Sequence, residues 1–509
     1  MSDGLYLAID VGTGSVRAAL VDKAGKLIAI RAFEHEQIVP EYGWSEQRPA
    51  DWWAGVTRAI RAVLDDAPDA ARRIAAICGC GQMHGTVLLD ANGQLTRDTV
   101  PLWNDKRTMG QVAAFEKRYR LDEFIAESGN PPAPPWPGFK LQWIRDNDPQ
   151  AYRRAAVVVM PKDYVNYRLT GEITMDRTEA ACSFMMDPRT GDWSQPMRDR
   201  LGLDRGKLAT IREPAEVLGG VSMEAARETG LRTGTPVLVG GGDYPVALLG
   251  SGVCRPGLGS DVTGTSCIIT VVADKPLLAP EISNVGTPEG NWGAFILLGT
   301  GGDAMRWARR AFHENGWSYE EIAAKAAEAQ AGAQRLFFMP YLVGERFGEH
   351  RNARAQFFGI TAEHGLAQLH RAVLEGVAFG ATRHLHLMEE ISGRKVERVV
   401  ASSGGAKSDL WLKIKASAYN IPILLPAEPE CGVIGAAALA ATAEGRFSRA
   451  EDAAGAFVRY EREILPDPGW AETYARMQPF FEKLYRHSQA LYDDLDRLQY
   501  GQQNGQEAV

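Results

Sequence analysis

The sequence predicts an α/β fold of two domains, in which mixed β-sheets are flanked by helices and a cleft lies between the two lobes. The length of 509 residues exceeds what a single hydrophobic core usually supports. Short apolar, β-branched runs alternate with stretches of helical periodicity. A polar turn at residues 10–15 (DVGTGS) has a near repeat at 261–266 (DVTGTS), which suggests two related halves that face each other. We expect a first domain at 1–250, a second at 251–490 and a polar tail at 491–509.

Composition limits the classes of function that need to be considered. Hydrophobic residues make up 45% and charged residues 24% of the chain, which is ordinary for a globular protein. The net charge of −8 argues against a nucleic-acid partner, although a nucleotide substrate needs no surplus of lysines. No signal peptide precedes the first strand, and the longest apolar run, 431–443, is too short to cross a bilayer, so we expect a cytoplasmic protein without a membrane partner. The oligomeric state stays open, with a homodimer as one option.

The cysteines do not predict a zinc site or a disulfide framework. Cys78 and Cys80 form a lone C-x-C that lacks a second pair. We expect reduced thiols in the core at all six positions, namely Cys78, Cys80, Cys182, Cys254, Cys267 and Cys431.

The first half is expected to open with three strands joined by glycine turns. A helix with apolar residues at helical spacing follows at 49–64, and a buried strand that ends in glycines follows at 74–80. This order of elements predicts a mixed sheet rather than a purely parallel one. The second half repeats the theme, with strands near 258–263, 267–273 and 294–299 and a helix at 303–313.

A proline-rich stretch at 129–138 allows two interpretations, a flexible linker or an ordered loop that reaches into a cleft. Trp136 and the helix-like sequence FKLQWIRD after it favour the ordered loop.

The stretch 236–266 carries the main chemical signal. The apolar strand PVLVG runs into three glycines that place Asp243 at its carboxyl end, where ligands bind in open α/β sheets. A small-residue helix, a second strand and the second polar turn follow. We interpret Asp243 as the base of a two-lobed phosphotransferase.

The first polar turn lies between two hairpin strands, so it is neither a P-loop nor a dinucleotide motif. Gly12 permits close approach of a phosphate, Thr13 and Ser15 add hydroxyl donors, and Asp10 could hold Mg²⁺ through water. A plain glycine-rich hairpin would explain this turn alone, but its near repeat favours a paired phosphate clamp.

Three further segments carry polar groups at predicted turns. Gln82, Met83 and His84 follow a strand with the wrong glycine spacing for NAD, so we expect a turn that faces a small hydroxylated ligand, or a purely structural histidine. Trp103, Asn104 and Asp105 combine an apolar ring with hydrogen-bonding groups, as sugar sites do, although a solvated turn is the alternative. The segment SGGAKS at 403–408 lies at a strand-to-helix junction, which favours anions or a nucleotide edge.

Together these segments resemble the FGGY carbohydrate kinases, a family of the actin/hexokinase/Hsp70 ATPase superfamily, and within it most of all the xylulokinases. The resemblance implies two ribonuclease-H-like domains and runs in the family's order from residue 5 to about 445. The matching segments are DVGTGSVRA, GQMHG, PLWNDKRT, MPKDYVNYRLTGE, GGGDYP, GTS at 264–266, MPYLVGERF, FFGITAEHGLAQLHRAVLEGV, SSGGAKSDLW and CGVIGAAALA.

The resemblance implies a role for each matching residue. Asp243 resembles the general base that takes the proton of the sugar hydroxyl, and Asp10 the carboxylate near Mg²⁺. Met83 and His84 resemble the contacts to a ketopentose. We expect further sugar contacts at Gln82, Trp103, Asn104, Asp105 and Tyr244, and ATP contacts at Gly12, Thr13, Ser15, Arg17, Gly264, Thr265, Gly302, Gly404, Gly405 and Ser408.

The expected reaction is the ATP- and Mg²⁺-dependent phosphorylation of a sugar hydroxyl, with D-xylulose converted to D-xylulose 5-phosphate. Three departures from the family pattern bear on the sugar: Tyr244 follows the base where xylulokinases usually carry Asn, the segment 343–349 reads VGERFGE, and the loop at 131–138 is rich in proline. The alternatives are a kinase for ribulose, fuculose, gluconate, glycerol or an autoinducer-like diol, a non-catalytic sugar-binding regulator, and a chaperone-type ATPase.

Overall fold

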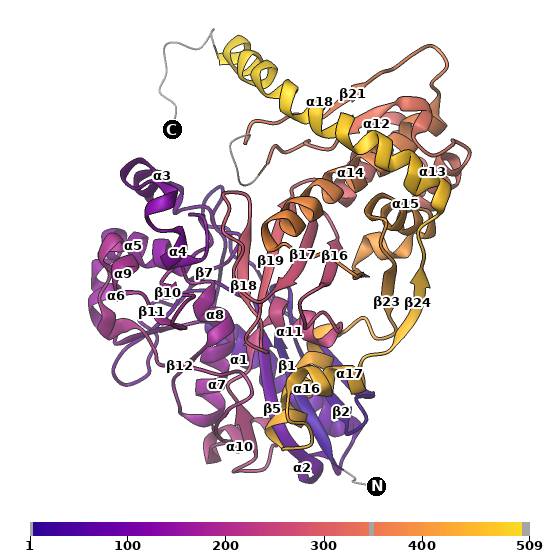
Figure 1. The fold of residues 1–509 in the computed structure, drawn as a ribbon. Helices are drawn as coiled ribbons and strands as arrows, with labels where there is room; N and C mark the ends of the chain where they lie inside the picture. Colours follow the sequence, from indigo (N-terminus) through magenta and orange to yellow (C-terminus); the bar gives the residue numbers. More distant parts are fainter. Residues whose placement is uncertain (1–3, 346–350, 501–509) are drawn as a thin grey trace.

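The computed structural model describes residues 4–345 and 351–500. Residues 346–349 of the segment VGERFGE and residues 501–509 of the polar tail lie outside these ranges. Residues 491–500, which we assigned to the tail, continue the C-terminal helix α18 (Pro468–Tyr500), which crosses the upper part of the molecule in Figure 1.

The first sheet has the strand order β13-β14-β5-β1-β2-β3. β1 (Leu5–Val11) pairs antiparallel with β2 (Ser15–Asp22) and parallel with β5 (Ile74–Gly81), which confirms the mixed sheet. The other members are β3 (Leu27–Glu34), β13 (Val217–Gly220), β14 (Pro236–Leu238) and the short β15 (Gly241–Gly242), which extends the pairing along β5.

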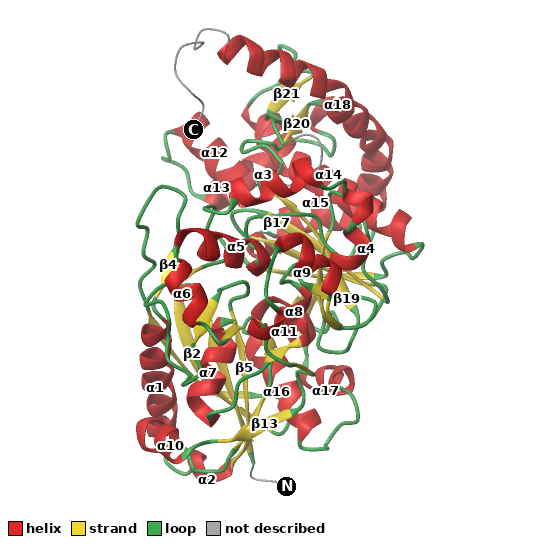
Figure 2. Cartoon of the chain, turned by 90° about the vertical axis from the view of Figure 1, so that its left-hand side faces the viewer, coloured by secondary structure: helices red, strands yellow, loops and turns green. Residues whose placement is uncertain are grey.

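Helices cover both faces of the first sheet (Figure 2). Alternate residues of β1 point to opposite faces, so Leu7 packs with Trp52 of α1 (Pro49–Asp66), whereas Ala8 packs on the other face with Leu439 of α16 (Cys431–Ala443). α7 (Pro161–Thr170) lies on the side of α1, and α11 (Asp243–Gly250) and α17 (Ala450–Phe457) lie on the side of α16. A helix from the end of the chain therefore completes the core of the first sheet.

The second sheet has the order β18-β19-β17-β16-β22-β23-β24 and repeats the core pattern of the first. β16 (Leu258–Thr263) pairs antiparallel with β17 (Cys267–Ala273) and parallel with β22 (Arg398–Ser402), as β1 does with β2 and β5. The remaining strands are β18 (Ser283–Gly286), β19 (Trp292–Leu298), β23 (Ile423–Pro426) and β24 (Tyr460–Ile464). Its helices are α12 (Gly302–His313), α13 (Tyr319–Ala327), α14 (Leu366–Ser392) and α15 (Asp409–Tyr419).

A region of short elements lies beside the two sheets (Figure 1). Its core contains an aromatic cluster in which Phe115 and Phe184 contact each other and both Phe124 and Phe139. The proline-rich stretch is ordered here, since Trp136 is buried and its Nε1 donates to Pro131 O at 2.8 Å. Its helices are α3 (Met109–Arg118), α4 (Ile125–Ser128), α5 (Pro137–Asn147), α6 (Pro149–Arg154), α8 (Arg177–Ala181) and α9 (Gln195–Leu201).

The remaining short helices are α2 (Ala70–Arg73) and α10 (Met223–Thr229). Short strands pair outside the two large sheets: β4 (Glu46–Gln47) with β7 (Val100–Pro101), β6 (Val87–Leu89) with β8 (Val157–Val159), β9 (Met175–Asp176) with β12 (Ile211–Arg212), β10 (Met186–Asp187) with β11 (Asp192–Trp193), and β20 (Phe337–Met339) with β21 (Gln356–Phe358).

All six cysteines lie in the described part of the chain, where each is buried and none is in a disulfide. No helix in the described part of the chain has both the length and the apolar character needed to cross a membrane.

Candidate active site

A tight glycine turn places Asp243 at the carboxyl ends of β1 and β5. Gly240 has φ +71°, and a Cβ there would lie 2.0 Å from the carbonyl oxygen of Gly79, so only glycine fits. β15 then pairs with Cys80 and Gly81 at the end of β5, and Asp243 begins helix α11. The carboxylate thus lies at the end of the sheet where the sequence predicts it.

Asp10, Arg17, Asp243 and Tyr244 line one cavity of about 400 Å³. The opposite wall comes from the second sheet and from the start of α16. The lining from these elements includes Ser260, Val262, Ser402, Ser403, Glu430 and Gly432. Residues some 400 positions apart in the sequence therefore share this cavity, and both sheets contribute to it.

The surroundings of Asp243 raise its pKa to about 7. Burial is the larger cause, and the neighbouring carboxylate of Asp10 adds to it. Arg17 Nη1 lies 3.0 Å from Asp10 Oδ2 and 3.8 Å from a carboxylate oxygen of Glu430. A carboxyl that titrates near neutral pH can accept a proton from a hydroxyl group during catalysis.

Asp10 also has an atom that suits a hydrated cation. Its Oδ1 is buried, and no nitrogen or oxygen donor in the described ranges reaches it. Mg²⁺ typically keeps several waters and takes only one or two carboxylates together with substrate phosphates. Asp10 Oδ1 is therefore the donor in this cavity that fits such a hydrated ion.

The first polar turn is in contact with the Trp103 segment. Gly12 N donates to Ser15 O at 3.0 Å and closes the turn. Trp103 Nε1 donates to the hydroxyl of Thr13 at 2.9 Å, and Gln47 Nε2 donates to the carbonyl of Thr13 at 2.6 Å. The Thr13 hydroxyl therefore already accepts a hydrogen bond from Trp103. This bond connects the turn that we expect to bind phosphate with the segment that we expect to bind the sugar.

The second polar turn packs against the start of α12. Gly264 N donates to Ser266 O at 2.9 Å, and Gly302 N donates to Gly264 O at 2.8 Å. A Cβ on Gly405 would lie 2.8 Å from Thr263 Cβ, so the segment at 403–408 also lies against this turn. The structure brings together these expected ATP residues, namely Gly264, Thr265, Gly302, Gly404 and Gly405, with Ser408 as the N-cap of α15.

The two polar turns differ at their first residue. Asp261, which matches Asp10 in the repeat, receives hydrogen bonds from Lys415 Nζ at 2.7 Å and from the Tyr419 hydroxyl at 2.8 Å. Burial opposes ionisation, but Lys415 lowers the pKa of Asp261 below its ordinary value. Asp261 is thus a buried ion-pair partner, and the repeat does not supply a second carboxylate to the cavity.

Of the expected sugar residues in the segment 82–84, Met83 lies next to the base. Met83 packs so closely that a Cβ on Gly242 would lie 2.8 Å from its sulfur atom. His84 has φ +69°, and its ring meets that of Trp136 edge-on at 5.1 Å. Gln82 donates to Gln47 Oε1 at 2.7 Å. Among the residues described, no partner reaches the buried oxygens Gln82 Oε1 and Asn104 Oδ1.

Lys140 holds the two expected sugar segments together, and the sequence interpretation missed it. Its Nζ donates to His84 O at 2.7 Å and to Leu102 O at 2.6 Å, and burial lowers its pKa to about 7. The sequence sign of this role is a lysine that stands between the apolar residues Phe139 and Leu141, on a part of the helix where all three are buried.

Two other expected sugar residues are engaged within the protein. Asp105 is buried, forms a two-point ion pair with Arg107 and accepts from Ser45 N at 2.7 Å. The Tyr244 hydroxyl is hydrogen-bonded to Thr270 of β17. Asp105 therefore shapes its loop, and Tyr244 connects α11 to the second sheet.

Comparisons with known proteins agree with the fold and the cavity. Models of the N-terminal and C-terminal domains of the FGGY family of carbohydrate kinases match residues 5–250 and 260–444. The xylulose kinase of Escherichia coli K12 is 31% identical over 95% of this chain and 99% of its own. A xylulose kinase structure from Rhodospirillum rubrum aligns with a TM-score of 0.90 at 29% identity, covering 96% of this chain and 99% of that chain. A gluconate kinase structure from Lactobacillus acidophilus aligns with the same TM-score at 26% identity, covering 97% and 100%.

Proposed function

The chain belongs to the FGGY family of carbohydrate kinases, enzymes that transfer a phosphoryl group from ATP to a sugar, and we propose that its acceptor is D-xylulose. The observation that carries the catalytic part is the Asp243 carboxyl, with a pKa of about 7, at the wall of a cavity that both sheets share. Met83, which packs against Gly242 directly before the base, and the similarity to xylulose kinases support the ketopentose.

In the proposed reaction Asp243 accepts the proton of the terminal sugar hydroxyl. The hydroxyl oxygen then forms a bond to the γ-phosphorus of ATP, the bond from that phosphorus to the bridging oxygen breaks, and ADP leaves with the electron pair. The product is D-xylulose 5-phosphate. A base with a pKa near the working pH typically accelerates such a step by about 10²–10⁴-fold.

We assign the ATP phosphates to the two polar turns, which approach from the two sheets. Gly12 and Gly264 allow the backbone to come close to phosphate oxygens, and Arg17 supplies a positive charge in the cavity. The adenosine part would lie against Gly302, Gly404 and Gly405. Mg²⁺ bound with ATP would offset phosphate charge, and Asp10 would hold it through water.

Gluconate is the second candidate acceptor. The residue after the base is Tyr244 rather than the Asn usual in xylulokinases, and its hydroxyl is bonded to Thr270, so this position departs from the xylulokinase pattern. The gluconate kinase of Lactobacillus acidophilus has the same overall fold. A cytoplasmic location and a homodimer stay predictions, to be tested by fractionation and light scattering.

The experiment that tests the proposal measures ADP release from Mg-ATP with a panel of ketopentoses, ketohexoses, polyols and aldonates. Acceptors are ranked by kcat/KM, because specificity is a ratio of these values. We expect D-xylulose to rank first by at least about tenfold, which corresponds to ~1.4 kcal/mol of transition-state binding. A higher value for gluconate would replace the first candidate by the second. Absence of turnover with every acceptor would contradict a catalytic role.

A further inference from the structure

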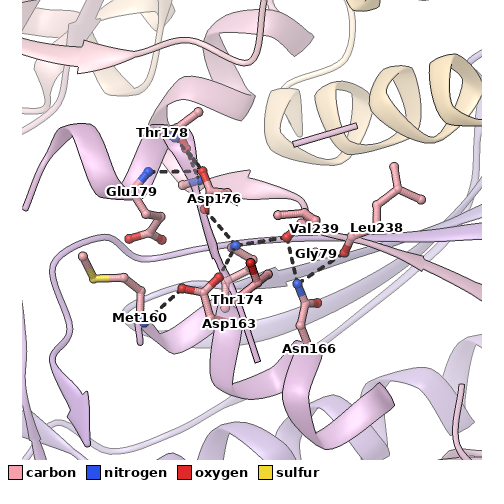
Figure 3. Close-up of polar contacts among 12 residues, drawn as sticks. Gly79, Met160, Asp163, Asn166, Thr174, Asp176, Thr178, Glu179, Leu238 and Val239 are labelled. Carbon is pink, nitrogen blue, oxygen red and sulfur yellow. Dashed lines mark hydrogen bonds and ion pairs between the residues drawn. The ribbon is translucent and has the colours of Figure 1, made fainter. Parts of the chain in front are cut away.

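A charged network lies directly beneath the turn that carries Asp243. Lys162 of α7 is completely buried, and its Nζ contacts Asp163, Asp176 Oδ2 at 2.8 Å and Val239 O at 3.0 Å (Figure 3). Burial by itself would lower the pKa of Lys162, but the nearby carboxylates raise it above its ordinary value, so the ammonium stays charged. A buried ion pair of this kind adds little net stability, so its geometry is the better guide to its role.

The network ends on the backbone of the glycine turn. Asp176 Oδ1 accepts from the Thr178 hydroxyl at 2.5 Å and from Thr178 N at 2.7 Å (Figure 3). The same hydroxyl accepts from Gly242 N at 2.9 Å. Gly242 directly precedes Asp243, so a continuous chain of contacts joins the buried lysine to the peptide that carries the base.

The other end of the turn is held by the same helix. Asn166 of α7 donates to Val239 O at 2.8 Å and to Leu238 O at 3.3 Å. Between these anchors the chain consists of three glycines, which have no side chains to restrict their conformations. Apart from the pairing of Gly241 and Gly242 with β5, the position of Asp243 therefore depends on side chains outside the turn, and Thr178 supplies the side-chain hydrogen bond to the Gly242 amide.

We propose that Thr178 is a positioning residue for Asp243, which acts by connecting the Lys162–Asp176 pair to the Gly242 amide. This inference rests on the proposed function, in which Asp243 is the general base. Thr178 does not contact the reacting atoms. It holds the peptide before the base, and a misplacement of about 1 Å in such a group can reduce a rate by about 10²-fold.

The test compares Thr178→Val with Thr178→Ser and with a matched control, Thr229→Val. Valine keeps the shape of threonine but removes the hydroxyl, whereas serine keeps the hydroxyl. Thr229 is equally buried and has the same double role elsewhere, since its hydroxyl donates to Ala225 O at 2.6 Å and accepts from Leu231 N at 3.3 Å. Thermal melting checks that each variant folds, and Thr178→Ala replaces the valine variant if that one does not.

We expect Thr178→Val to lower kcat by about 10- to 100-fold with less than about threefold change in the KM for ATP. Thr178→Ser should restore kcat to within about threefold of the wild type, and Thr229→Val should leave it unchanged.

Equal kcat values for Thr178→Val and Thr229→Val, or a Thr178→Ser variant as slow as Thr178→Val, would overturn the proposal. Asp243→Asn, measured in parallel, separates this failure from failure of the proposed function. If Asp243→Asn retains turnover, the assignment of the base is wrong. If it loses turnover while Thr178→Val matches the control, the base assignment holds and only the positioning role is wrong.

Discussion

Replacing Asp243 by asparagine should reduce activity and change how stability depends on pH. The pKa of Asp243 in the folded protein is about 7, against an ordinary value of 3.8. Between these values the folded state holds a proton that the unfolded state has lost. The wild type is therefore stabilised at low pH and loses this contribution as the pH rises through 7. Asparagine cannot ionise, so the free energy of unfolding of the Asp243→Asn variant has no such loss as the pH rises.

The structure sets the size of the effect. A pKa difference of three units corresponds to about 4 kcal/mol in the free energy of unfolding. The carboxyl is only partly buried at the wall of a water-accessible cavity, so solvent screening should reduce this to ~2 kcal/mol. Turnover of the preferred sugar should fall by about 10²–10⁴-fold, the usual contribution of a general base.

Thermal melting of both proteins between pH 5 and pH 9 measures the stability effect without any substrate. We expect the Tm of Asp243→Asn, relative to the wild type, to increase between pH 5 and pH 8 and then to level off. Binding of ATP, followed by titration calorimetry, should change little and serves as the control for an intact site. A Tm difference that does not depend on pH, or a variant with near-normal turnover, would refute the reasoning.

Three other substitutions test neighbouring parts of the site. Asp10→Asn should move the acid limb of the kcat/KM profile to lower pH, because the Asp10 charge helps to raise the pKa of Asp243; an unmoved limb would contradict their coupling. Gly302→Ala should raise the KM for ATP by about tenfold (~1.4 kcal/mol) and leave the KM for sugar unchanged, because its Cβ would lie 2.5 Å from Gly264 O; equal changes in both constants would argue against a nucleotide site there. Tyr244→Phe should lower the free energy of unfolding by about 1–2 kcal/mol through loss of the hydrogen bond to the second sheet, with little change in the KM for sugar; a tenfold rise in that KM would mean that the phenol reaches the sugar.

Much of the fold could be predicted because its signals are local. The hairpin of β1 and β2, the long helix α1 and the strand β5 occur where the apolar periodicity and the glycine turns indicate them. The position of Asp243 after a buried strand follows from the same kind of signal, since a strand that ends in glycines delivers the next side chain to the edge of a sheet.

The partners of individual side chains could not be predicted in this way. Asp10 and Asp261 stand in nearly identical sequences, yet Asp10 faces the cavity and Asp261 is neutralised by Lys415, which lies more than 150 residues away. We expected the Thr13 hydroxyl to be a donor to phosphate, and only the fold brings Trp103 within hydrogen-bond distance of this hydroxyl.

The sequence alone therefore determined the strands, the glycine turns and the candidate base, because each depends on residues that are neighbours in the chain. The tertiary structure decided which carboxylates face the cavity, which hydroxyls are already engaged, and that helix α16 from the end of the chain completes the first core. These properties depend on which distant elements pack together, and burial then sets the charge and the hydrogen-bond partners of each group.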